Sequence, residues 1–176
     1  MVTEQSDPAR LAEDGKRAFE AREFQRAAVL FHQAAEGYTL GRAGLLAAEM
    51  KNNMSVALLQ AGRPSEALEA AQGTDQIFAG ANDKKRQAMA LGNQAAALEA
   101  LHRPEEALAL YERSAEIFAE AGEGDLRAVV MKSAAAIKLK SGKVRESAFR
   151  MMGALEAKEK PSLFERILKF ILRIKL

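Results

Sequence analysis

The stretch that decides the fold occurs twice, at a distance of 40 residues. Residues 53–79 read NMSVALLQAGRPSEALEAAQGTDQIFA, and residues 93–119 read NQAAALEALHRPEEALALYERSAEIFA. In one ungapped register Asn53 aligns with Asn93, Pro64 aligns with Pro104, and both stretches end in Ile-Phe-Ala. A recurrence at 20 to 50 residues is the signature of repeat architectures, in which similar units stack on their neighbours. The sequence therefore predicts a repeat protein.

Each repeat has the pattern of two helices. Small and apolar residues recur at helical spacing from Met50 to Ala61, and Gly62 then interrupts the pattern. Pro64 and Pro104 open the second helix, because proline fits the first helical turn, where its missing N–H would have no partner. The chain is 48% hydrophobic and rich in alanine, which is the strongest helix former. These features predict an all-α fold built of helical hairpins.

The outer repeats are weaker copies in the same phase. Ala27 lies 40 residues before Ala67, and Gly142 lies 80 residues after Gly62, which gives about four repeats. Terminal repeats are expected to deviate, since one of their faces meets solvent or a cap. The expected organisation is a disordered start over residues 1–7, a helical-hairpin solenoid over 8–160 and an amphipathic helix over 161–176.

This pattern resembles the tetratricopeptide repeat family, in the variety with repeats of about 40 residues. The resemblance covers roughly Pro8 to Lys158 and implies a right-handed solenoid. Ala71 and Met151 stand where an aromatic residue is usual, and His102 replaces the glycine of the turn. We expect these departures to loosen local packing without changing the topology. The matching residues are Gly15, Phe24, Ala27, Phe31, Ala34, Gly62, Pro64, Ala67, Pro104, Ala107, Tyr111, Ser114, Gly142 and Ala154.

The resemblance also implies a binding groove, because in this family the first helices of successive repeats line a concave face. Asn53 and Asn93 share one phase of the repeat, and an amide can both donate to and accept from the backbone of a bound peptide. The alternative is that each amide bonds a neighbouring helix or faces water. The groove positions carried over are Glu49, Asn52, Asn53, Val56 and Gln60 in the second repeat; Met89, Asn93, Ala96 and Glu99 in the third; and Lys132, Ser133, Ala136 and Lys140 in the fourth.

The last 16 residues have a different character. Ser162 and Glu165 form a capping box at the start of a predicted helix. Its apolar face covers roughly 200° of the helical wheel, and cations occupy the narrow remainder. Three surfaces can cover that face: the chain's own repeats, an anionic membrane interface, or another copy or partner. The predicted contact residues are Leu163, Phe164, Arg166, Ile167, Leu168, Lys169, Phe170, Ile171 and Arg173.

Reactive chemistry is not indicated. The chain has no cysteine, and His32 and His102 lack the spacing of a metal site, so neither a metal nor a cofactor is expected. Two clusters of basic residues have no aromatic side chains beside them on which bases could stack, and this argues against binding of nucleic acid. The sequence thus predicts a non-enzymatic scaffold that binds another polypeptide in its groove. The alternative is a scaffold held at a membrane by its C-terminal helix. The expected location is the cytoplasm, at the inner face of a membrane in the second case.

Overall fold

The computed structural model describes residues 7–140 and Gly142, and within that range the chain forms eight α-helices and no strand. The all-α prediction is confirmed. The predicted helix at 161–176 and the second half of the predicted fourth repeat, residues 143–160, lie outside the described residues, as do residues 1–6 and 141. The helices are α1 (Pro8–Glu20), α2 (Phe24–Leu40), α3 (Gly44–Gln60), α4 (Pro64–Ala71), α5 (Thr74–Gly80), α6 (Lys84–Ala100), α7 (Pro104–Glu120) and α8 (Gly124–Lys140).

The turns show that the 40-residue repeat is made of two halves with equal spacing. Helices begin at residues 24, 44, 64, 84, 104 and 124, and a residue with positive φ lies two positions before each start. At the end of α1 the N–H of Glu23 donates to the carbonyl of Ala18 over 2.8 Å, and Arg103 donates to Leu98 over 3.0 Å in the same way. This is a Schellman ending, in which a left-handed residue lets the chain satisfy the last helical carbonyls.

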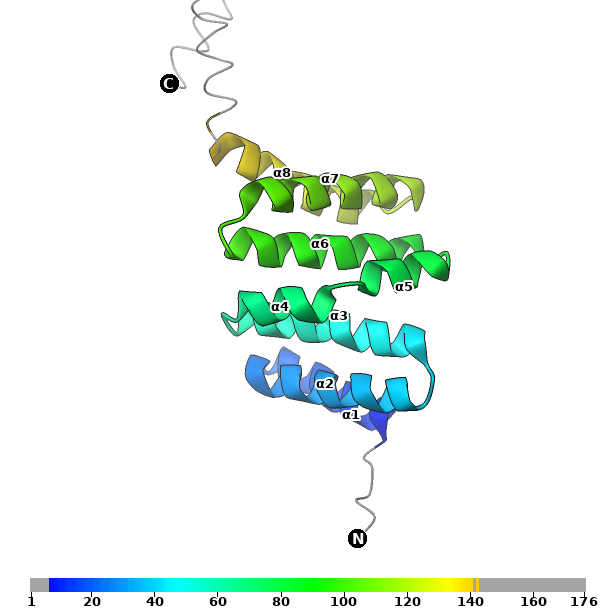
Figure 1. Ribbon diagram of the computed structural model, residues 1–176. Helices are drawn as coiled ribbons and strands as arrows, with labels where there is room; N and C mark the ends of the chain where they lie inside the picture. The colour runs from blue at the N-terminus through cyan, green and yellow to red at the C-terminus, as the bar shows by residue number, and fades with distance from the viewer. Residues whose placement is uncertain (1–6, 141, 143–176) are drawn as a thin grey trace, which may run out of the picture. The chain divides into compact units, whose positions relative to one another are not determined.

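The helices pack in chain order. The chain divides into two compact units after Ala134. In the first unit α1 packs on α2, α2 on α3, α3 on α4 and α5, and α6 on α7 (Figure 1). The first helices of the second and third repeats, α3 and α6, also contact each other. The hairpins therefore stack in sequence order, which confirms the helical-hairpin solenoid. Of the second unit, the structure describes the end of α8 and Gly142.

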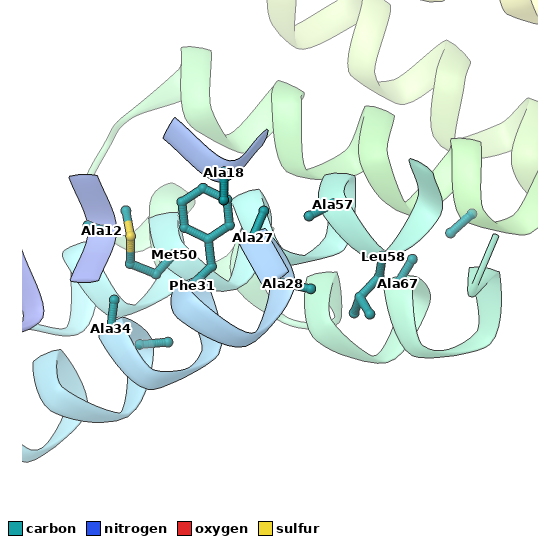
Figure 2. Packing of buried hydrophobic residues seen from close by; sticks show 12 residues of the cluster. Ala12, Ala18, Ala27, Ala28, Phe31, Ala34, Met50, Ala57, Leu58 and Ala67 are labelled. Carbon is teal, nitrogen blue, oxygen red and sulfur yellow. The ribbon is translucent and has the colours of Figure 1, made fainter. Parts of the chain in front are cut away.

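The core of the first two hairpins consists mainly of alanines around a few large side chains. Phe31, Met50 and Leu58 lie among them and are each 3% exposed or less (Figure 2). Small residues let the helices approach closely, and Gly15 shows how closely. A Cβ atom added at Gly15 would lie 2.8 Å from Cε1 of Phe31. The ring of Phe31 thus packs directly on the backbone of α1.

One departure from the family pattern changes the backbone. The sequence predicts a single second helix in each repeat, whereas the structure interrupts that of the second repeat at residues 72–73, between α4 and α5. Gly73 has φ +77° at the break. Nε2 of Gln94 on α6 donates to the carbonyl of Ala71 over 3.2 Å and to Oδ1 of Asp75 over 2.9 Å. Oγ1 of Thr74 donates to the same carbonyl over 2.7 Å, so Thr74 and Gln94 together satisfy the carbonyl of Ala71 at the interruption.

The equivalent helix of the third repeat, α7, is continuous. Tyr111 occupies the position of Ala71 there and is 5% exposed. Its hydroxyl donates to Oε2 of Glu99 over 3.3 Å. A large side chain thus occupies, in the third repeat, the position that a fully buried alanine occupies in the second. The expectation that Ala71 only loosens packing was too weak, because the helix itself is interrupted there.

Candidate functional site

A cleft of about 360 Å³ opens beside the first helices of the first two repeats. α1 and α3 supply most of its lining, and Phe31 of α2 adds an aromatic ring. Three of the lining side chains are apolar, one is an amide and three are charged. The lining residues are Lys16, Phe19, Glu20, Phe31, Glu49, Asn53 and Val56.

The helical period of α3 explains which of its predicted groove residues line the cleft. Glu49, Asn53 and Val56 are spaced four and three residues apart, so they share one face of the helix. Asn53 is half-buried and makes no side-chain hydrogen bond within the described part of the chain. Asn52 is only 6% exposed and accepts an internal hydrogen bond. Gln60 is exposed near the end of α3.

The predicted residues on α6 divide between surface and internal contacts. Met89 is 40% exposed, and Ala96 is half-buried. Nδ2 of Asn93 donates to Oδ1 of Asn52 over 2.9 Å, so this amide bonds the neighbouring helix. The carboxylate of Glu99 accepts from the buried hydroxyl of Tyr111.

Two of the four residues predicted on α8 belong to the first compact unit. Lys132 is exposed, and Ser133 is half-buried and hydrogen-bonds the Tyr111 hydroxyl. Ala136 and Lys140 belong to the second unit, where Ala136 is half-buried and Lys140 is exposed.

The charges at the cleft are unevenly paired. Nζ of Lys16 lies 2.7 Å from Oε1 of Glu13, and that hydrogen bond, with the nearby charge of Glu49, raises the pKa of Lys16. Glu49 is 3.0 Å from the guanidinium of Arg86. Glu20 forms no ion pair with any residue of the described range.

Arg86 anchors the Glu49 side of the cleft. Its Nε donates to Oδ2 of Asp83 over 2.6 Å, and its guanidinium lies 5.3 Å from the ring centre of Phe78. The hydrogen bond to Asp83 raises the pKa of Arg86, and the bonds that Asp83 accepts from the Arg86 backbone and side chain lower the pKa of Asp83. Arg86 therefore stays charged and joins α6 to Glu49 on α3.

Four lining residues were missed by the sequence analysis, which placed no groove position on the first repeat. The 40-residue step contains the signal for two of them, because it relates Val56 to Lys16 and Gln60 to Glu20. Phe31 was identified only as a packing residue, whereas it packs in the core and also lines the cleft. The repeat gives no signal for Phe19, because the residue 40 positions later, at 59, is leucine and not aromatic.

The described residues give no sign of other classes of site. No group of three or more potential metal ligands occurs among them. None of their helices combines the length and the apolar character that crossing a bilayer requires.

The comparisons with known proteins address the repeat directly. A family model described as tetratricopeptide repeat matches residues 86–160, which include nearly all of α6 and the whole of α7 and α8. No curated protein matches the chain. Proteins of this family typically bind other proteins and are non-enzymatic scaffolds. The helical hairpins and their order agree with this match, which supports the resemblance of the chain to the tetratricopeptide repeat family.

Proposed function

We propose that this protein is a non-catalytic scaffold that holds a peptide or helix of another protein against α1, α3 and α6. The observation that carries the proposal is the cleft lined by Phe19, Phe31, Val56 and Asn53. Its lining combines apolar surface for an anchoring side chain with an amide that bonds backbone groups in either direction. Asn53 supports this role better than Asn93, whose amide already bonds α3.

The energetics require more than one contact. Burial of one large apolar side chain contributes about 1.5–3 kcal/mol, whereas micromolar binding corresponds to about 8 kcal/mol. The partner must therefore extend beyond the cleft. Met89, 40% exposed on the adjacent helix α6, offers further apolar surface. A polypeptide segment supplies such a series of anchors, and a small metabolite does not.

The test is a selection of random peptides displayed on phage against the full-length chain. Selected peptides are synthesised and titrated by fluorescence anisotropy. We expect Asn53→Ala to weaken binding about five- to tenfold, the effect of losing a hydrogen bond worth about 1 kcal/mol. Gln33→Ala removes an exposed amide from α2 and serves as the matched control. Equal affinities for wild type and Asn53→Ala, with both folded by circular dichroism, contradict the proposal.

The position of the bound peptide can be mapped independently. Because the chain contains no cysteine, Asn53→Cys introduces a single attachment site for a thiol-reactive benzophenone. Photolysis should cross-link a selected peptide to Asn53→Cys and not to Gln33→Cys. Cross-linking of equal yield at both positions would place the peptide elsewhere.

A further inference from the structure

We infer that the segment bound in this cleft is cationic: a large apolar side chain enters between α1 and α3, and a lysine or arginine beside it pairs with Glu20. The inference rests on the proposed function and specifies the chemistry of its partner. It follows from the charges of the cleft and from the pairs that these charges already form.

The only cation in the lining has a partner. The ammonium of Lys16 is held by Glu13 at 2.7 Å, so an acidic residue of a ligand would compete with an existing ion pair. It would also approach the carboxylates of Glu20 and Glu49, both of which line the cleft. Like charges at short range oppose binding, and this disfavours acidic segments.

One acid in the lining lacks a partner. Glu49 forms an ion pair with Arg86, which also bonds Asp83. Glu20 has no ion pair within the range that the structure describes. A lysine or arginine of the ligand would give Glu20 an ion-pair partner without breaking any contact of the cleft. Because Glu20 lies next to Phe19 in sequence and both line the cleft, the cation would stand beside the apolar anchor.

The described part of the chain has a net charge of the same sign as Glu20. Residues 7–140 contain 19 acidic and 17 basic side chains, so the described part is slightly negative. This excess is too small to steer a ligand over long distances, since salt screens charges beyond about 8 Å at physiological ionic strength. The preference should therefore arise at the cleft and depend on Glu20.

The experiment is a charge swap on the full-length chain. Peptides are selected in parallel on wild type and on Glu20→Lys from one random library. We expect the wild-type peptides to combine large apolar residues with lysine or arginine and to be depleted of acids. Replacing the cation of such a peptide by glutamate should weaken its binding to wild type about tenfold. Glu20→Lys should weaken the original peptide at least fivefold and restore binding of the glutamate version.

A second variant controls for net charge. Glu69→Lys changes the charge by the same amount at an exposed position on α4 and should alter these affinities less than twofold. Acidic or uncharged selected peptides, or equal effects of Glu20→Lys and Glu69→Lys, overturn the inference while the proposed function stands. If wild type selects no peptide at all, the proposed function fails first. Sedimentation equilibrium tests whether a second copy of the chain occupies the cleft. A wild-type dimer that dissociates in the Glu20→Lys variant would show this and would also overturn the inference.

Discussion

Asn93 on α6 donates a hydrogen bond from Nδ2 to Oδ1 of Asn52 on α3, 41 positions earlier in the chain. The pair joins the first helices of two successive repeats, and Asn52 is 6% exposed. We expect Asn52→Ala to lower the free energy of unfolding by about 1–2 kcal/mol, because it leaves the Asn93 amide without its partner. A double-mutant cycle with Asn93→Ala, measured by urea denaturation, should give a coupling of about 0.5–1.5 kcal/mol. Strictly additive effects would show that the bond contributes nothing.

Gly15→Ala should destabilise the fold by about 1–3 kcal/mol. The new methyl group would stand 2.8 Å from Cε1 of Phe31, and overpacking of a tight core costs this much. Gly92→Ala is the matched control, since the nearest atom to its Cβ, Cγ1 of Val130, is 3.5 Å away. There the higher helix propensity of alanine should stabilise the chain by up to about 1 kcal/mol. Thermal denaturation of the two variants compares them, and similar melting temperatures would contradict the packing at Gly15.

His102→Gly should raise the free energy of unfolding by about 0.5–1 kcal/mol. His102 ends α6 with φ +58°, a conformation that costs a residue with a side chain about 1–2 kcal/mol, while the greater chain entropy of glycine offsets part of the gain. The reciprocal variant tests the same idea. Gly62 occupies this place 40 residues earlier with φ +75°, and Gly62→His should destabilise. Denaturation that gives both changes the same sign would refute the explanation.

Tyr111 should ionise well above the usual range. Burial raises its pKa to about 12, the nearby carboxylate of Glu99 adds to the rise, and the hydrogen bond with Ser133 opposes it. Because the folded state favours the neutral phenol, the stability from this group is present below the ordinary pKa of 10.0. It is lost as the pH rises through about 12. Absorbance at 295 nm in a Tyr38→Phe background, where Tyr111 is the only tyrosine, measures the ionisation. Ionisation near pH 10 with an intact circular dichroism spectrum would contradict the burial.

The helices and turns could be predicted because their signals are local. Pro64 and Pro104 mark helix starts, and both are the first residue of their helix in the structure. The interruption after Ala71 has a weaker signal, Gly73, because an isolated glycine inside a helical pattern is tolerated and does not by itself end a helix. Only the structure shows that Gln94 of the next repeat joins Thr74 in hydrogen-bonding the carbonyl of Ala71.

The candidate site was predictable to the extent that one helix face determines it. Glu49, Asn53 and Val56 share a face of α3, and all three are among the groove positions that the family resemblance implies. Asn52 and Asn53 are adjacent, and the sequence cannot tell which amide points at a neighbouring helix, since that depends on how α3 and α6 pack. The aromatic part of the cleft required knowledge that the buried ring of Phe31 on α2 lines the cleft beside α1 and α3.

The equal spacing of the turns has a consequence for how this protein changes length. Several helices have 17 residues, and the turns within a hairpin and between hairpins use the same left-handed position. Duplication or loss of any 40-residue segment within this region would therefore leave every remaining helix in phase with its neighbours. The side-chain contacts between repeats are less uniform, since the bonds of Gln94 to Ala71 and Asp75 belong to the interrupted second repeat alone, so the backbone tolerates a change of length more readily than the contacts do.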